Sequence, residues 1–433
     1  MENNFKYLYQ ILQYWANNAA EEIYITTEKD SMTYLYAWKY SLSVATFLNK
    51  INDNDPIIIQ CTRPINFVLA FWGCIIRGNH IYIGQAEKNY YTIDDSIIEY
   101  IRNSTTNYNN DIFLHRHNFS IYLNSSGTTN KPHIIQNTEQ QFVDAINSIK
   151  RYPPMDYLMK KGYAFISVQP THSFGLSSIV EYTLGGYRLF IPESFQLISL
   201  LKSISQNIEK IDTIAGTPFL LQSILKLFPD LCFSSLKQII LGTDMIPYYT
   251  LQMLLQKNLK MNIICRYGLS ELPSVISASI VNNSNIKTFS PQLLSSCLDI
   301  YQLEYQTYDN YTELIIKDYN GNKYRTGDNI IYNKDGFLLQ GRCSSIFKYN
   351  GYKINSNLIE QELKDNECNI SDCVLFLDCN KLTLKIEATN KITEAAIIIL
   401  WKKIISCEFL PDKILFVDKI NRTETGKKVR HAY

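Results

Sequence analysis

Residues 122–133, Tyr-Leu-Asn-Ser-Ser-Gly-Thr-Thr-Asn-Lys-Pro-His, form the stretch around which the rest of this chain is organised. A β-prone run, Ser120 to Leu123, leads into a turn in which hydroxyl side chains surround Gly127. Such a turn offers backbone N–H groups and hydroxyl donors in a small space, which suits a polyphosphate. Gly127 lets the backbone approach an anion without a Cβ in the way. Taken alone, the stretch is equally typical of a Ser/Thr-rich surface loop, so the rest of the chain has to decide.

Length and composition predict a globular protein of more than one domain. The chain has 433 residues, of which 46% are hydrophobic, and this is too long for one ordinary core. The net charge of +1 gives no argument for a nucleic acid or an anionic membrane as partner. The most apolar run, residues 67–76, is too short to span a bilayer. We therefore expect neither nucleic-acid binding nor a membrane span.

The cysteines predict a reducing compartment. The ten cysteines contain no C-x-x-C pair, and the N-terminus has no signal-peptide pattern. Cys368, Cys373 and Cys379 are the closest group, but no histidine lies near them in sequence, so buried free thiols are favoured over a zinc site. Scattered thiols of this kind fit a cytoplasmic protein.

The first part of the chain predicts an α/β sheet. Residues 56–61 read as a buried strand, residues 66–77 as an apolar helix ended by Gly78, and residues 80–83 as the next strand. Strand, helix and strand in this order form a βαβ unit. Further helices are predicted over residues 4–19, 34–48 and 138–149.

Several later strands end in polar turns, where α/β sheets place ligands. The strand at residues 163–168 opens into a loop that contains His172, which would either line a pocket or cap the helix starting near Leu176. Strands at 211–214, 236–241 and 261–264 follow, and the last leads through a glycine turn to Glu271. A carboxylate there can reach a metal or a ribose, although a lone glutamate is usually only solvated.

From Thr312 onward, the pattern of the sequence predicts a small α+β module. Short strands are expected at residues 313–316 and 330–332, around Tyr324-Arg-Thr-Gly-Asp328, and helices at 357–363 and 393–405. The break near Gly341-Arg342 predicts a large α/β domain of layered sheets and helices over residues 1–341. It also predicts a small C-terminal domain over residues 342–433.

Six segments, in this order, resemble motifs of the adenylate-forming superfamily, which includes acyl- and aryl-CoA ligases, carrier-protein ligases, peptide-synthetase adenylation domains and luciferase. One such motif would be weak evidence, but six at compatible spacing are very improbable by chance. The segments are Ser126-Gly-Thr-Thr129 with Lys131-Pro132, Pro170-Thr-His-Ser-Phe-Gly175, Tyr267-Gly-Leu-Ser-Glu271, Tyr324-Arg-Thr-Gly-Asp328, Gly341-Arg342 with Lys348 and Gly351, and Thr423-Glu-Thr-Gly-Lys427 with Arg430.

The resemblance implies that a carboxylate attacks the α-phosphate of ATP to give an acyl-adenylate, after which a thiol displaces AMP. Both reacting groups of the first step, the carboxylate and the phosphates of ATP, are negatively charged. Mg²⁺, hydrogen-bond donors and a lysine must therefore offset the charge. The implied cofactors are ATP and Mg²⁺, with coenzyme A or the phosphopantetheine arm of a carrier protein as the thiol. The second step would follow a swing of the small domain about a hinge that joins it to the large one.

The resemblance also implies a role for each motif residue. Lys427, Thr128 and Glu271 would be catalytic, with Glu271 and Thr128 holding the metal ion. The nucleotide would be bound by Ser126, Gly127, Thr128, Thr129, Lys131, Tyr267, Ser270, Asp328 and Arg342. His172, Phe174 and Gly242 would line the substrate pocket, and Lys348 and Gly351 the thiol channel.

The chain departs from the family pattern in several places. Asn130, His133 and Ile134 stand where the phosphate loop usually has Gly, Lys and Gly, and Ser344 stands at the hinge position. A glutamate of the helix after the hinge is replaced by Leu358. The departures at 130–134 and 344 leave open a second class of function, a non-catalytic nucleotide- or acyl-binding scaffold in a biosynthetic assembly. The retained Glu271, Asp328, Arg342 and Lys427 favour the enzyme.

The substrate-side motif indicates the class of acid. Amino-acid-activating relatives carry an aspartate just after the motif aromatic, whereas this chain has His172-Ser173-Phe174. An acid without an α-amino group, either an aryl or a fatty acid, is therefore favoured. Because the sequence ends at Tyr433, we expect no fused carrier domain, and a carrier protein would then be a separate partner.

Overall fold

The computed structural model describes residues 4–50, 55–84, 88, 90–104, 118–124, 134–290, 292–367, 369–378, 380–388, 390–405, 409–422 and 428–430. The chain divides into two compact units. Unit 1 comprises Met1–Thr243, Leu254–Asn285 and Leu298–Ile300, and unit 2 comprises Asp244–Met253, Ile286–Cys297 and Tyr301–Tyr433.

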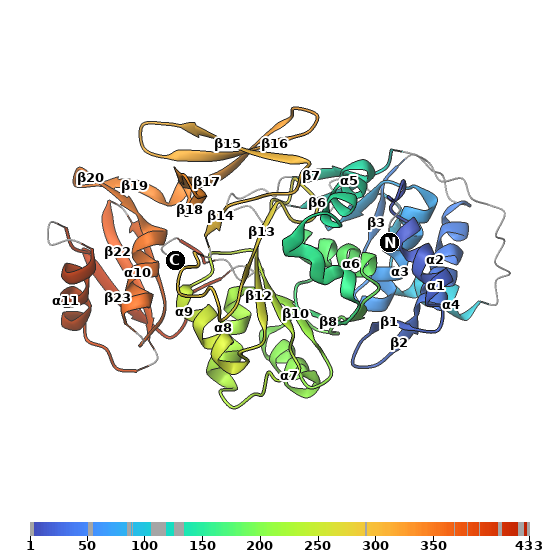
Figure 1. The fold of residues 1–433 in the computed structure, drawn as a ribbon, viewed down its shortest axis with the longest axis horizontal. Coiled ribbons are helices and arrows are strands. Elements are labelled where there is room, and N and C mark those ends of the chain that lie inside the picture. Colours follow the sequence, from blue (N-terminus) through green and yellow to red (C-terminus); the bar gives the residue numbers. More distant parts are fainter. Residues whose placement is uncertain are drawn as a thin grey trace. The chain divides into compact units, whose positions relative to one another are not determined.

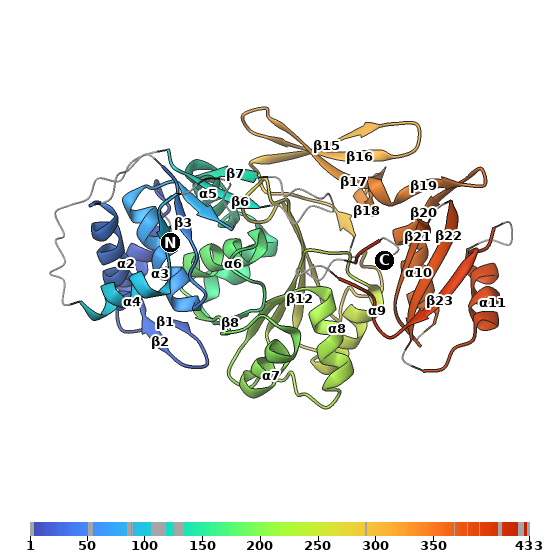
Figure 2. The same ribbon diagram turned by 180° about the vertical axis from the view of Figure 1, so that it is seen from behind.

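The larger sheet of unit 1 has eight strands in the order β13-β12-β11-β10-β8-β9-β1-β2 (Figures 1 and 2). The strands from β12 to β1 are parallel to their neighbours, and the edge strands β13 and β2 are antiparallel. Their bounds are β1 Ile23–Thr26, β2 Ser31–Thr33, β8 Tyr163–Ile166, β9 Arg188–Phe190, β10 Thr213–Gly216, β11 Gln238–Leu241, β12 Asn262–Tyr267 and β13 Ser277–Val281.

The second sheet of unit 1 has five strands in the order β5-β3-β4-β6-β7. They are β3 Ile57–Ile59, β4 Ile81–Ile83, β5 Thr92–Ile93, β6 Ser120–Asn124 and β7 Ile134–Thr138. Strand β7 is antiparallel to β6, and the other pairs are parallel. Because β3 and β4 pair in parallel on either side of α3 in the chain, the predicted βαβ unit is confirmed.

The helices of unit 1 supply much of its core. They are α1 Gln10–Asn18, α2 Tyr34–Leu48, α3 Pro64–Arg77, α4 Asp95–Asn103, α5 Glu139–Ile149, α6 Ser173–Leu184, α7 Leu197–Asn207 and α8 Pro218–Leu227, with a 3₁₀ segment at Pro153–Lys160. Every residue of α3 is buried, as expected for a helix in which almost every residue is apolar. A Cβ on Gly73 would lie 2.5 Å from Val44 Cγ1, so this glycine lets α3 pack closely on α2. Helix α9 spans Tyr248–Lys257.

Unit 2 is built on an antiparallel sheet with the strand order β14-β18-β17-β16-β15. The bounds are β14 Leu293–Leu294, β15 Tyr301–Thr307, β16 Thr312–Asp318, β17 Lys323–Asn333 and β18 Gly336–Arg342. Strands β15 and β16 form a long hairpin in both views (Figures 1 and 2).

The last part of unit 2 is a small α+β module. A three-stranded sheet of β21 Ile370–Asp378, β22 Lys381–Ala388 and β23 Lys413–Val417 accompanies α10 Ser356–Asn366 and α11 Glu394–Ile404. Trp401 of α11, Leu363 of α10 and Leu384 of β22 are fully buried in one shared apolar core. The hairpin of β19 Ile346–Tyr349 and β20 Tyr352–Asn355 precedes the module.

The α/β and α+β architectures confirm the predicted fold class, with two local differences. The segment Tyr324–Asp328 was expected between two short strands but lies inside the single strand β17. Gly327 has φ +69°, and the register of the β16–β17 pair shifts, so an irregular strand resembled a turn in the sequence. The first helix begins at Gln10 instead of residue 4.

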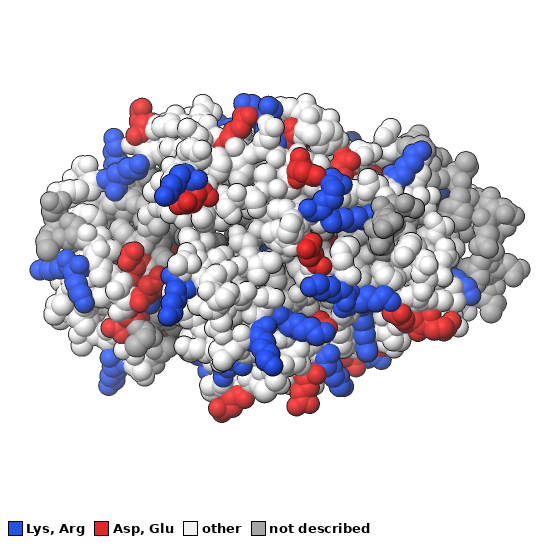
Figure 3. All heavy atoms as spheres, in the orientation of Figure 1, with Lys and Arg blue, Asp and Glu red and all other residues white. Residues whose placement is uncertain are grey.

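No helix among the described residues is long and apolar enough to cross a membrane. On the face drawn in Figure 3, lysine and arginine side chains are mixed with aspartate and glutamate side chains, in keeping with the small net charge. The described cysteines, including Cys373, are free thiols, as predicted, whereas Cys368 and Cys379 lie outside the described residues.

A buried hydrogen-bond chain joins three elements of unit 1 and provides a test of its packing. Trp72 Nε1 of α3 donates to Tyr24 Oη of β1 at 3.0 Å, and this hydroxyl lies 2.8 Å from Thr183 Oγ1 of α6. Burial raises the pKa of Tyr24 to about 12, so the phenol stays protonated.

We expect Tyr24→Phe to lower the free energy of unfolding by about 1–3 kcal/mol, because the buried Trp72 donor loses its acceptor. Urea denaturation followed by circular dichroism measures the change. The control is Tyr36→Phe, whose ring is half exposed and should cost under about 0.5 kcal/mol. Equal effects of the two variants would contradict the role of this chain.

Candidate active site

The predicted substrate-side and adenine-side motifs of unit 1 follow neighbouring parallel strands. The loop with His172 follows β8, Gly242 follows β11, and Tyr267 is the last residue of β12. Strands β8, β10, β11 and β12 pair in parallel in that order, so their carboxyl ends meet at one edge of the sheet. The fold therefore brings these motifs together from positions far apart in the sequence.

The loop after β8 leads directly into α6. His172 occupies the N-cap position, but its side chain makes no capping hydrogen bond, so the capping alternative is not supported. Its backbone N–H donates to Gln169 O at 3.0 Å. A Cβ on Gly175 would lie 2.1 Å from the same carbonyl oxygen, so only glycine fits at this tight entry into the helix.

Two of the predicted pocket residues lie against each other. A Cβ placed on Gly242 would stand 3.7 Å from the Phe174 ring and 3.8 Å from Arg266 Cβ, which is ordinary contact distance. The missing side chain at position 242 thus leaves space beside the Phe174 ring. That this space is part of the substrate pocket stays a prediction.

The turn after β12 is tied to the other motifs. Ser270 Oγ lies 3.1 Å from Ser173 Oγ at the start of α6. Ser270 O accepts from Asn137 Nδ2 of β7 at 3.0 Å. Strand β7 is one arm of the β6–β7 hairpin, in which Asn124 pairs with Ile134 across the ends of residues 125–133. The base of the predicted phosphate loop and the Ser270 turn are thus held together.

Sequence reasoning missed a buried ion pair next to Phe174. Arg266 donates to both oxygens of Glu181, each at 2.7 Å, and the side chains are 4% and 1% exposed. Ser274 Oγ also donates to Glu181, at 2.5 Å. Burial works against the charged guanidinium, but the Glu181 carboxylate outweighs it and raises the pKa of Arg266. The available signal was that Glu181 and Arg266 are each the one charged residue of their element.

This pair also lies beside Phe174, one of the predicted pocket residues. The Arg266 guanidinium carbon lies 5.3 Å from the centroid of the Phe174 ring, within cation–π range. Ser274, in turn, donates its N–H to Ser177 of α6 at 3.0 Å. One charge pair therefore joins β12, the turn after it and α6.

Glu271, the predicted metal ligand, lies exposed in the turn after β12. Within the described part of the chain, no group of three or more His, Cys, Asp or Glu side chains is placed to hold a metal ion. A single carboxylate with substrate phosphates is nonetheless a usual donor set for Mg²⁺.

Unit 2 brings together the predicted ribose and nucleotide residues. Asp328 and Arg342 are register partners on β17 and β18, and Arg342 Nη1 donates to Asp328 Oδ1 at 2.9 Å and to Thr326 O at 2.8 Å. The Asp328 N–H donates to Thr326 Oγ1 at 3.0 Å. Because Arg342 is the last residue of β18, the predicted domain boundary falls at a strand end, and it stays a prediction.

The predicted thiol-channel residues lie in the β19–β20 hairpin of unit 2. Asn350 and Gly351, with φ +48° and +84°, form a two-residue turn between the paired Tyr349 and Tyr352. Asn-Gly is the sequence preferred for such turns. Lys348 is exposed on β19. Their role at a thiol channel stays a prediction.

The rest of the predicted site falls outside the described residues. These positions are Ser126, Gly127, Thr128, Thr129, Asn130, Lys131, His133 and Lys427. Ile134, the third departure in the phosphate loop, is described and is 46% exposed at the start of β7. Ser344 is exposed in a short 3₁₀ segment, Cys343–Ser345.

No family model matches this sequence, and no curated protein matches it. Solved structures do match. An o-succinylbenzoate CoA synthetase from Bacillus subtilis, in complex with its acyl-adenylate, matches with TM-score 0.77 at 16% identity, covering 97% of this chain and 96% of that chain. An anthranilate CoA ligase in complex with anthranoyl-AMP matches with TM-score 0.80 at 15% identity over 99% and 96% of the two chains.

The chain has the adenylate-forming enzyme fold. An amide bond synthetase from Marinactinospora thermotolerans shares this fold, with TM-score 0.75 and 13% identity over 97% of this chain and 98% of that one. At such identities the likeness establishes the fold, and the chemistry has to be argued from the residues of this chain.

We expect Glu181→Gln to destabilise unit 1 by about 3–5 kcal/mol, because the buried Arg266 guanidinium loses its counter-charge. The matched control is Glu22→Gln, which breaks an ion pair of 2.9 Å with Lys161 whose side chains are about half exposed. That pair should contribute about 0–1 kcal/mol. Thermal and urea denaturation of the two variants compare the losses, and similar losses would refute a supporting role for the buried pair.

Proposed function

We propose that this chain activates a carboxylic acid with ATP and then transfers the acyl group to a thiol. In the first step a carboxylate oxygen bonds to the α-phosphorus while the bond to pyrophosphate breaks, giving an acyl-adenylate. In the second step the thiol sulfur bonds to the acyl carbon, AMP leaves with the bonding electrons, and the thiol proton passes to solvent. The meeting of Phe174, Gly242 and the Ser270 turn at one sheet edge of an adenylate-forming fold carries this proposal.

The proposed roles follow the motif positions. Ser126, Gly127, Thr128, Thr129 and Lys131 hold the phosphates, Ser270 contacts the α-phosphate, Tyr267 stacks on adenine, Asp328 accepts from the ribose hydroxyls, Arg342 assists on the nucleotide, and Lys427 bridges the carboxylate and the α-phosphate. Mg²⁺, held by Glu271 and Thr128, would neutralise phosphate charge. A compact ammonium such as that of Lys427 suits a point where negative charge builds up. In the second step Lys348 and Gly351 would border the channel for the thiol.

The electrostatics of α6 support a substrate without an α-amino group. The acidic residue of α6 is Glu181, and Arg266 and Ser274 already engage its oxygens. A substrate ammonium at the pocket would also face the positive charge of Arg266 across the Phe174 ring. An aryl or fatty acid avoids both conflicts, and an aryl ring suits the space left beside Phe174.

Pyrophosphate release with ATP, Mg²⁺ and hydroxylamine, over a panel of aryl, fatty and amino acids, tests the proposal. We expect pyrophosphate release with one class of acid. In Lys427→Ala the rate of this release should fall by about 10²–10³-fold. ATP binding, measured by calorimetry, should stay nearly unchanged. The control is Lys419→Ala, an exposed lysine upstream in the chain.

A wild type as inactive as Lys427→Ala across the whole panel, but still binding ATP, would instead support a non-catalytic nucleotide-binding scaffold. Once the acid is known, coenzyme A, a phosphopantetheinylated carrier protein and an amine, offered in place of hydroxylamine, identify the acceptor.

Substitution at Gly242 tests the pocket separately. Gly242→Ala adds a Cβ at contact distance from Phe174 and should be accommodated, whereas Gly242→Leu fills the space beside the ring. We expect Gly242→Leu to raise KM for the preferred acid at least about tenfold, the usual effect of lost pocket volume. KM for ATP should not change. An unaltered KM for the acid in Gly242→Leu would place the pocket elsewhere.

A further inference from the structure

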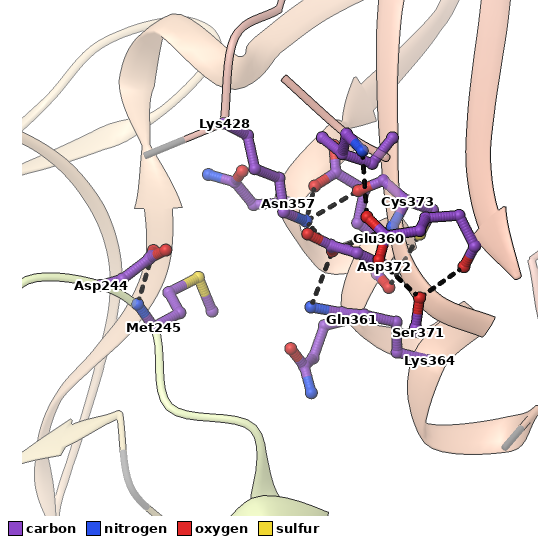
Figure 4. Close-up of polar contacts among 12 residues, drawn as sticks. Asp244, Met245, Asn357, Glu360, Gln361, Lys364, Ser371, Asp372, Cys373 and Lys428 are labelled. Atoms are coloured by element: carbon purple, nitrogen blue, oxygen red, sulfur yellow. Dashed lines mark hydrogen bonds and ion pairs between the residues drawn. The ribbon is translucent and has the colours of Figure 1, made fainter. Parts of the chain in front are cut away.

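A cluster of buried charges in unit 2 surrounds the chain on both sides of residues 423–427 (Figure 4). Glu360 of α10 and Asp372 of β21 are 3% and 7% exposed at their side chains. Their cationic partners come from α10 and from the C-terminal segment. These are Lys364, Arg422, Lys428 and Arg430.

Asp372 binds both flanks of residues 423–427. Its Oδ2 forms an ion pair with Arg422, and its Oδ1 lies 2.7 Å from Lys428 Nζ. The backbones of Arg422 and Lys428 form an antiparallel bridge, and Val429 N–H donates to Asn421 O at 2.9 Å. One carboxylate thus clamps the chain by binding the residue before the segment 423–427 and the residue after it.

Glu360 holds the returning strand from the other side. Its Oε2 lies 3.0 Å from Lys428 Nζ, and both of its oxygens pair with Arg430. Lys428 Nζ also donates to Cys373 O at 2.7 Å, and Leu375 N–H donates to Glu360 Oε1 at 2.9 Å. Lys428 is therefore fixed by α10 and β21 together.

The surrounding cations keep both carboxyls of the cluster ionised. Burial alone would raise the pKa of both carboxyls, yet Lys428 together with the other cations and hydrogen bonds of the cluster outweighs burial, and the pKa values of Glu360 and Asp372 are lowered. Both carboxyls stay ionised at neutral pH. Removing either negative charge would leave buried cations without compensation.

We infer that Asp372 and Glu360 are positioning residues for acid activation, because they fix the chain directly next to Lys427. This rests on the proposed function, in which Lys427 reaches the α-phosphate. Consecutive Cα atoms are about 3.8 Å apart, so anchoring Lys428 limits where Lys427 can be. An error of about 1 Å in such a group can lower a rate about 10²-fold.

The test uses Asp372→Asn and Glu360→Gln in the full chain, with controls on the same elements. Asp378→Asn changes a partly exposed carboxylate on β21, and Glu362→Gln an exposed one on α10. Hydrogen exchange read by mass spectrometry reports on the C-terminal peptide that contains Val429, independently of any activity. We expect exchange there to become at least about tenfold faster in Asp372→Asn and Glu360→Gln, but not in the controls, since the local opening becomes easier.

The kinetic arm separates positioning from simple stability. We expect kcat for pyrophosphate release to fall about 10–100-fold with KM for ATP unchanged within about twofold, because only an interaction with the transition state is lost. Thioester formation from a supplied acyl-adenylate should keep its rate. Asp372→Glu, which retains the charge, should recover most of kcat. A uniform loss in both half-reactions, or an unchanged kcat, would overturn the inference.

Two further outcomes are decisive. If Asp372→Asn does not fold, Arg422→Gln can replace it, because this variant removes one contact of the clamp and leaves the Glu360 pairs in place. We expect it to lower kcat as well, but by a smaller factor. A wild type that releases no pyrophosphate with any acid overturns the proposed function and the positioning role with it. The exchange arm would still show whether the clamp exists.

Discussion

The parallel pairing of β8, β10, β11 and β12 is the constraint on which the candidate site depends. Each of these strands is short, and each ends in a polar turn, so parallel register alone places the turns at one edge. The contacts of Phe174 with Gly242 and of Ser173 with Ser270 follow from that register. A one-residue slip would turn the side chains of a strand to the opposite face and separate these contacts.

The sequence predicted the strands that form this edge well because their signals are local. Buried strands followed by Gly-, Pro- and Ser-containing turns need no partner to be recognised, and the βαβ unit around α3 was predicted for the same reason. Buried charge pairs are different, since an isolated Arg266 or Glu181 looks like a solvated residue until the strand and the helix meet. At strand β17 a local signal was present but misleading. A glycine with positive φ, Gly327, made an irregular strand resemble a turn.

The C-terminal segment shows where motif reasoning ends. The motif singled out Lys427 and Arg430, while Lys428 would have been taken as a solvated lysine. In the structure Lys428 is nearly buried, and its raised pKa results from Glu360 and Asp372, which outweigh the cost of burial. The spacing of Glu360, Asp372 and Lys428 along the chain gives no sign of this, because the three meet only when α10 packs on β21.

The two ion networks follow the same physical logic in different units. Arg266 with Glu181 and Lys428 with Glu360 and Asp372 each bury charge that apolar packing could replace at little or no cost in stability. What an apolar replacement would not supply is direction, because bidentate and multiply bonded charges fix a backbone at one place instead of merely covering it. Directional fixing matters most beside groups that must meet a transition state, and each network adjoins a segment to which the motifs assign such a task. In this view, charged side chains that do not contact the substrate hold the neighbouring motif residues where those residues can contact it.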